Sequence, residues 1–160
     1  MTSLKLGAPA LALALGLGAC FAPPTQSRRV TDAAREMNIA ARFGRMDIAV
    51  EHAARGARQS FLERRADWGH NLRVLDVQLS GLSLKDEHHA SVHVDISWER
   101  MNEGMLRQTR VAQLWRDTEK GGWQLVREKR IAGDFGLFGE NVEVLHPEHR
   151  DAHFPSKTIR

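Results

Sequence analysis

The chain has 160 residues, one cysteine, and 23 basic against 20 acidic side chains, which gives a formal net charge of +3. The two signs are interleaved, without a basic block or a basic stripe between aromatic residues, and this pattern argues against specific nucleic-acid binding. A single cysteine also excludes a disulfide within the chain.

The first 19 residues predict an exported protein. Lys5 supplies a short positive region, and residues 6–17 form an apolar run, interrupted by Pro9, that has the length of a secretory signal. The run is shorter than the roughly 20 apolar residues that span a bilayer, and no later segment is as apolar. We therefore expect a cleaved leader and no transmembrane helix in the mature chain.

The end of the leader reads Leu17-Gly18-Ala19-Cys20 and resembles the lipobox of bacterial lipoproteins. This resemblance implies that Cys20 becomes the mature N-terminus and carries a thioether-linked diacylglycerol and an N-acyl chain. More than one acyl chain makes attachment to a membrane stable. Phe21 replaces the Asp that tends to retain lipoproteins in the inner membrane, so the sequence resembles the outer-membrane class. The alternative is an ordinary signal peptide in which Cys20 is a bystander.

Residues 21–27 are expected to form a short extended tether, because they contain Pro23-Pro24 and small polar residues. Such a tether keeps the following domain close to the lipid. Arg28 and Arg29 lie near the anchor and would add attraction to an anionic membrane surface.

The next segment has helical spacing of its apolar residues. Thr31 is the expected N-cap of a first helix that ends at Gly44. Asp47 is expected to cap a second helix, which continues through Ala53 and is weakened or broken at Gly56. The sequence thus predicts two or three amphipathic helices in the first half.

From residue 71 onward the apolar period changes from helical to alternating. Val92, Val94 and Ile96 alternate with polar residues in the clearest strand, and mixed parity near Val74-Leu75 predicts a bulge. Polar or glycine-containing turns separate the strands, which favours an antiparallel meander. The four expected strands cover residues 72–80, 90–98, 105–116 and 123–131.

Helices followed by four antiparallel strands constitute an α+β layout. Over residues 30–133, the order and lengths resemble the NTF2-like (SnoaL-like) superfamily, in which N-terminal helices pack into the concave side of a curved sheet. A cystatin-like sheet around one helix is the second fold hypothesis, and a small β-barrel is the third. The segments that carry the NTF2-like resemblance are Phe61-Leu62, Ile96-Ser97-Trp98, and Trp115 followed by Gly122-Trp123.

Four parts of the chain are therefore expected. They are a leader over residues 1–19, an anchor and tether over 20–29, one α+β domain over 30–140, and a flexible His-rich tail over 141–160.

The NTF2-like resemblance implies either an isomerase or dehydratase, or a non-catalytic binding or assembly module. An enzyme would need an acid or base inside the cone. Asp76, Asp95 and Glu99 lie on the polar side of their strands and are expected to face away from the helices. No catalytic residue is therefore predicted.

A metal site is the third functional hypothesis. His146, His149 and His153 would share one face of a helix. Zinc requires three or four preorganised ligands, and terminal tails of this composition are commonly unstructured, so these three histidines stay candidates and no metal is predicted.

The aromatic residues are expected mostly in the core, including the four tryptophans Trp68, Trp98, Trp115 and Trp123. In the glycine-rich loop 133–139, we expect the apolar residues to pack over the sheet edge or to contact a partner or lipid. Those loop residues are Phe135, Leu137 and Phe138.

These observations predict a lipoprotein of the outer membrane, facing the periplasm or the exterior, that binds an unidentified envelope protein or a small apolar ligand without cofactor. The alternative is an enzyme with a pocket between helices and sheet. An acid, base or histidine among apolar neighbours in that pocket would favour the enzyme, whereas a space filled by Trp and Leu side chains would argue against it.

Overall fold

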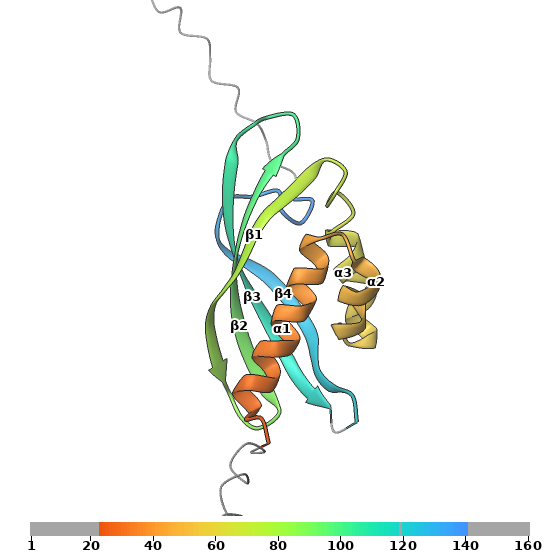
Figure 1. The fold of residues 1–160 in the computed structure, drawn as a ribbon, viewed down its shortest axis with the longest axis vertical. Coiled ribbons are helices and arrows are strands. Elements are labelled where there is room, and N and C mark those ends of the chain that lie inside the picture. The colour runs from red at the N-terminus through yellow and green to blue at the C-terminus, as the bar shows by residue number, and fades with distance from the viewer. Residues whose placement is uncertain (1–22, 119, 141–160) are drawn as a thin grey trace, which may run out of the picture.

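The computed structural model describes residues 23–118 and 120–140. Three α-helices precede four β-strands along the chain, and two short 3-10 turns lie between the second and third helices (Figure 1). The helices and turns are α1 (Gln26–Arg42), α2 (Met46–Ala49), η1 (Val50–His52), η2 (Arg55–Ala57) and α3 (Arg58–Arg64). The strands are β1 (Leu72–Leu84), β2 (His89–Arg100), β3 (Leu106–Thr118) and β4 (Gly122–Gly133).

The four strands form one antiparallel sheet in the order β1-β2-β3-β4, which confirms the predicted meander. The register shifts between Val74 and Asp76, where the sequence predicted a bulge, and again between Leu79 and Gly81. Two further shifts occur in the β3–β4 pair. Bulges bend strands and increase their twist, so they contribute to the curvature of this sheet.

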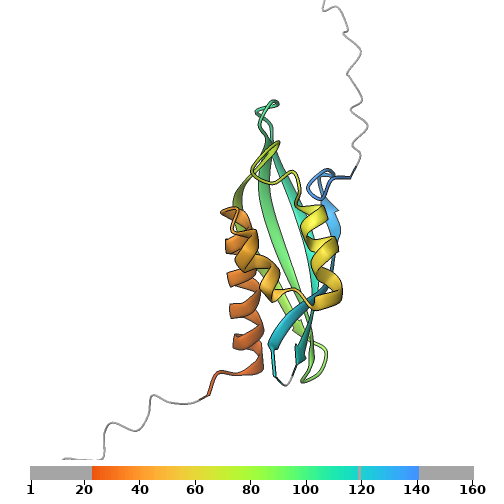
Figure 2. The ribbon, with the colours of Figure 1, turned by 90° about the vertical axis from the view of Figure 1, so that its right-hand side faces the viewer.

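The helices cover the same face of the sheet, as Figure 2 shows for α1 and α3. On β2 the buried side is Ala90, Val92, Val94, Ile96 and Trp98, in the predicted alternation. More than one helix covers the sheet, whereas the cystatin-like hypothesis has a single helix. The outer strands β1 and β4 do not pair with each other, so the sheet is open and does not close into a barrel. The α+β prediction is confirmed, and the cystatin-like and β-barrel alternatives are wrong.

The first helix starts earlier than the sequence predicted. Thr25, not Thr31, is the N-cap, and its side-chain oxygen accepts a hydrogen bond from the backbone N–H of Arg28 at 3.3 Å. Helical structure from Gln26 buries Val30 completely, which favours the longer helix. The tether predicted through residue 27 is therefore wrong beyond Thr25.

The second helix also differs, because α2 ends at Ala49 and the chain is extended at Ala53 and Ala54. Ala53 forms a parallel bridge with Leu125, and the N–H of Ala54 donates to the carbonyl oxygen of Leu125 at 2.9 Å. The segment thus covers part of the exposed edge of β4, a long-range pairing that local helical spacing does not report.

Candidate functional site

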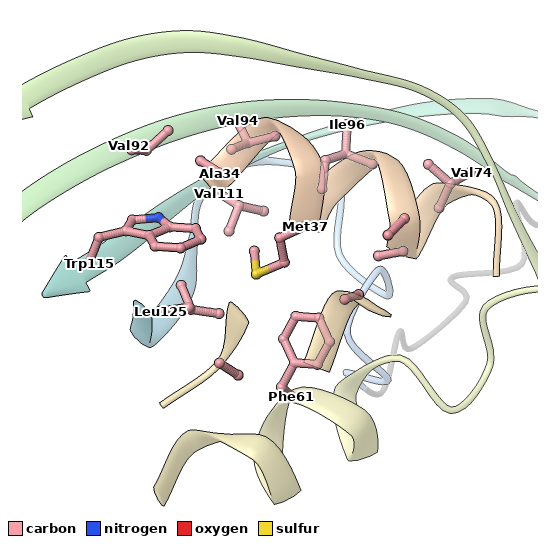
Figure 3. Packing of buried hydrophobic residues seen from close by; sticks show 14 of the residues in the cluster. Ala34, Met37, Phe61, Val74, Val92, Val94, Ile96, Val111, Trp115 and Leu125 are labelled. Carbon is pink, nitrogen blue, oxygen red and sulfur yellow. The ribbon is translucent and has the colours of Figure 1, made fainter. Parts of the chain in front are cut away.

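Side chains occupy most of the space between the helices and the sheet (Figure 3), and the pocket that remains between α3 and β4 has a volume of only about 40 Å³. Met37 points from α1 toward Phe61 of α3 and toward the strands, and its relative exposure is 0%. A void that admits water would leave exposed surface on its lining, so no such space adjoins the side chains that are 0% exposed. The sheet residues with 0% exposure are Val94, Ile96, Trp98, Val111 and Gln113.

All four tryptophans lie in the core, as predicted, with relative exposures between 0% and 6%. The indole N–H of Trp98 donates to Thr109 Oγ1 at 2.9 Å. That of Trp123 donates to Gln26 Oε1 at 3.3 Å. These bonds let large aromatic groups fill the cone while keeping two indole N–H groups satisfied.

One acidic side chain does lie inside the cone, and it is Glu128 of β4. Its side chain is 4% exposed and is paired with Arg65, which is 1% exposed and directly follows α3. Arg65 Nη2 donates to Glu128 Oε2 at 2.8 Å, and Arg65 Nη1 donates to Glu128 Oε1. The pair is bidentate, so the carboxylate charge is neutralised where it lies.

Two amides extend this polar cluster across the cone. Gln113 of β3 donates from Nε2 to Asn38 Oδ1 at 3.0 Å, and Asn38 Nδ2 donates to Gln113 Oε1 at 3.0 Å. Asn38 Nδ2 also donates to the carbonyl oxygen of Ala34 at 2.7 Å. Gln113 Nε2 lies 3.5 Å from Glu128 Oε2, which joins the amides to the ion pair.

Aromatic rings enclose the guanidinium of Arg65. Its central carbon lies 3.8 Å from the ring centre of Phe61, 4.9 Å from Trp68 and 5.3 Å from Phe138. The cation therefore has a carboxylate on one side and ring faces around it, an arrangement that compensates its desolvation. We interpret the cluster as an internal clasp between helices and sheet, because no unpaired acid or base remains in it.

Glu128 could not be predicted to face inward from the alternation of residues, because β4 contains a bulge. Trp123 and Leu125 point inward, so strict alternation assigns residue 127 to the inner side. The register shift between Leu114 and Trp115 makes Val126 an extra residue and turns Glu128 inward, opposite Gln113. No local sequence signal marks this bulge.

The carboxylates considered from the sequence are engaged elsewhere. Asp95 accepts two hydrogen bonds from Arg110 on the outer face, at 2.6 and 2.7 Å, and this contact lowers the pKa of Asp95. Glu99 accepts from Arg73 Nε at 2.9 Å on the same face. Asp76, unlike the other two, contacts a helix, because it is paired with Arg42, the last residue of α1, at 3.3 Å. The prediction that Asp95 and Glu99 face away from the helices is confirmed.

The described histidines do not converge. The backbone N–H of His88 donates a hydrogen bond to Asp86 Oδ1 at 2.8 Å, and His89 Nδ1 lies 2.9 Å from the same oxygen. These contacts, the bond from His88 first, lower the pKa of Asp86. Within residues 23–118 and 120–140, no three His, Cys, Asp or Glu side chains are grouped as metal ligands. The candidates His146, His149 and His153 lie outside the described residues, as does the lipidation candidate Cys20.

The loop after β4 closes over the polar cluster. Leu137 is 0% exposed, and its carbonyl oxygen accepts a hydrogen bond from the indole N–H of Trp68 at 2.9 Å. Phe138 packs beside the guanidinium of Arg65, whereas Phe135 is 54% exposed and lies against Arg130. Leu137 thus belongs to the core. Of the three apolar loop residues, Phe135 alone has a largely exposed side chain.

Two larger grooves lie on the part of the surface that the structure describes, besides the small pocket between α3 and β4. The α1–α2 groove has a volume of about 530 Å³, and its exposed apolar residues are Ile39 and Phe43, the latter 69% exposed. Its rim carries both signs of charge. The outer-face groove has a volume of about 450 Å³ and lies on the sheet face turned away from the helices. Its lining includes Lys85, His89, Ser91, Leu114, Arg116 and Val126.

No protein-family model and no curated protein matches the chain. Solved structures do. A SEC-C motif-containing protein from Rhodopseudomonas palustris has 16% identity and a TM-score of 0.55, over 68% of this chain and 83% of that one. A ketosteroid isomerase-like protein from Erwinia carotovora atroseptica has 12% identity and a TM-score of 0.54, over 67% and 97%. An NTF2-like protein from Cytophaga hutchinsonii has 13% identity and a TM-score of 0.50, over 64% and 94%.

The chain has the NTF2-like fold. At these identities the similarity establishes the fold alone, and the activities named for the neighbours do not follow from it. The NTF2-like cone of this chain holds Met37, Phe61 and four tryptophans in the space where an enzyme would need a pocket. In the part of the chain that the structure describes, no helix has the length and hydrophobicity to cross a bilayer.

Proposed function

We propose that this protein is a bacterial envelope lipoprotein whose NTF2-like domain acts as a non-catalytic binding or assembly module. The filled cone is the observation that carries the proposal. Met37, Trp98 and Val111 have no exposed surface, so a substrate would have to displace core side chains to enter. Binding through the outer surface requires no such rearrangement.

The buried acid supports the same proposal. A general acid or base must be free to exchange a proton with the substrate. Glu128 instead makes a bidentate pair with Arg65 and lies beside Gln113. An enzyme of the isomerase or dehydratase type would have to break this pair before Glu128 could act.

Attachment to the membrane is proposed through acylated Cys20, in the outer membrane. Replacing Cys20 by Ala should abolish the mass added by acylation and release the protein from the membrane fraction. Intact-mass spectrometry and fractionation of cells that express either form measure this. An unlipidated wild-type protein that stays in the membrane fraction would contradict the anchor.

The binding role can be tested by photocrosslinking in intact cells. A photoreactive amino acid is placed singly at exposed apolar positions on different faces, with the buried position Leu137 as the matched negative control. At least one exposed position should give a discrete adduct with an envelope component. Adducts at no exposed position would contradict a binding role. The exposed positions are Phe43, Leu106, Leu114 and Phe135.

A further inference from the structure

On the outer face of the sheet, the basic side chains of one half are paired with carboxylates of described residues, whereas those of the other half are not. In one half, Arg73 is paired with Glu99, and Arg110 is paired with Asp95. Cross-strand neighbours in a sheet share a face, so these pairs neutralise that half of the surface. Arg73 and Arg110 are therefore unavailable for an added anion without loss of an existing ion pair.

The other half of the same face carries basic residues without such compensation. Arg127 lies opposite Leu114, and Lys129 lies opposite Ala112, so both basic side chains belong to the outer face. Among the residues that the structure describes, no carboxylate lies within 4.0 Å of Arg116, Arg127 or Lys129. This half therefore presents a net positive surface.

The outer-face groove lies in this basic half. Leu114 and Val126 supply its apolar surface and are 38% and 41% exposed. Lys85 and Arg116 line the same groove, and no Asp or Glu is among its lining residues. Asp86 lies in the neighbouring turn, where it is bonded to His89. A volume of about 450 Å³ is within the range of small-molecule sites.

The groove lies at the end of the molecule where α1 begins. Figures 1 and 2 both place the start of α1 at the same end as the β1–β2 and β3–β4 turns. Arg29, near the start of α1, is paired with Asp117 at 3.5 Å. Asp117 follows the groove residue Arg116 in β3, so this contact places the start of α1 close to the groove end of the sheet. Cys20 precedes the cap residue Thr25 by five positions, a length that an extended chain spans in at most about 18 Å.

We propose that the outer-face groove binds an anionic phospholipid of the membrane to which the protein is anchored. The phosphate of the headgroup contacts Lys85 and Arg116, and the first acyl carbons lie against Leu114 and Val126. Arg127 and Lys129 extend the positive surface beside the bound headgroup. The inference rests on the proposed anchor, because the short distance to Cys20 holds this end near the bilayer.

Titration of the full chain carrying Cys20→Ala tests the site without the anchor. The probe is dihexanoyl phosphatidylglycerol below its critical micelle concentration, observed through the methyl NMR signals of Leu114 and Val126. We expect saturable shifts of both. Lys85→Gln combined with Arg116→Gln should weaken the affinity roughly tenfold or more, since each basic side chain near an anionic surface contributes about a fivefold factor.

Arg73→Gln is the matched control, because it removes a positive charge from the ion-paired half of the same face. It should leave the affinity for phosphatidylglycerol within about twofold. Equal shifts with inorganic phosphate would show a free-anion site, and equal affinity for dihexanoyl phosphatidylcholine would show that net charge is irrelevant. Either result, or absence of saturable shifts, would overturn the proposal. Because the titrated chain lacks Cys20, failure here is distinct from failure of the acylation test.

Discussion

Arg65 and Glu128 are both almost fully buried, so the charge of each is compensated chiefly by the other. Glu128→Gln keeps the size of the side chain but leaves a buried guanidinium without its carboxylate. We expect a loss of about 3–5 kcal/mol in the free energy of unfolding. The double variant Arg65→Met, Glu128→Leu should lose much less, because removing both charges leaves neither one uncompensated.

Glu99→Gln supplies the comparison for this pair, since it breaks the outer-face pair in which Arg73 is 63% exposed. Its expected cost is within about 1 kcal/mol. Urea denaturation of the four proteins measures all these differences. If Glu128→Gln costs no more than Glu99→Gln, the interpretation of the cluster as an internal clasp is wrong.

The ionisation of Asp95 makes the free energy of unfolding depend on pH. Its hydrogen bonds from Arg110 lower its pKa below the ordinary value of 3.8, so the folded state binds a proton less readily than the unfolded state. The stabilisation is fully present above pH 3.8 and is lost as the pH falls through the lower folded-state pKa. Asp95→Asn should therefore be less stable than wild type near neutral pH, with a gap that closes on acidification.

Denaturant unfolding of wild type and Asp95→Asn at a series of pH values from 7 downward measures this gap. The expected gap stays constant to about the ordinary pKa of aspartate and then shrinks. A gap that widens on acidification would mean that Asp95 is not stabilised in its charged form.

Among the elements, the β3–β4 pair has its tightest requirement at Gly133. Its φ is +81°, and an added Cβ would lie 2.1 Å from the carbonyl oxygen of Gln108 on the neighbouring strand. Gly133→Ala must therefore push the backbones of β3 and β4 apart and also hold an alanine at positive φ. We expect it to lower the free energy of unfolding by at least about 3 kcal/mol.

Gly44 is the matched position for this test. Its φ is +74°, but an added Cβ would meet no atom within 4 Å. Gly44→Ala should cost only the backbone strain, about 1–2 kcal/mol. Urea midpoints of the two variants compare the costs, and equal destabilisation would contradict the close approach at Gly133.

The strands were more predictable from the sequence than the helix boundaries. Alternation from Ala90 to Trp98 follows from a sheet with one covered face, and it also indicated that Asp95 faces outward. The extended segment at Ala53 depends on pairing with Leu125, far along the chain, so its local sequence favoured a longer helix. Tertiary pairing overrode local propensity there.

The inner polar cluster was the least predictable part. Arg65 and Glu128 are separated by 63 positions, and each lies in a stretch rich in exposed charged residues. A one-residue bulge decides which face Glu128 occupies. By contrast, burial of the four tryptophans followed from their size and hydrophobicity alone.

For the whole molecule, we infer that side chains pack the NTF2-like cone into a core without a ligand pocket, and we propose that binding occurs on the outer surface. Methyl NMR of the full chain carrying Cys20→Ala, titrated with benzene, tests whether the cone admits a small apolar ligand. Met37→Ala in the same chain is the positive control, because it opens an apolar cavity where Met37 now packs.

The interior methyl groups of Val94, Ile96 and Val111 report on the cone. We predict that benzene leaves their signals unchanged in the parent chain and shifts them saturably in the Met37→Ala variant. Saturable shifts of these interior methyl groups in the parent chain would instead reveal a ligand pocket between the helices and the sheet, and the cone would then not be a packed core.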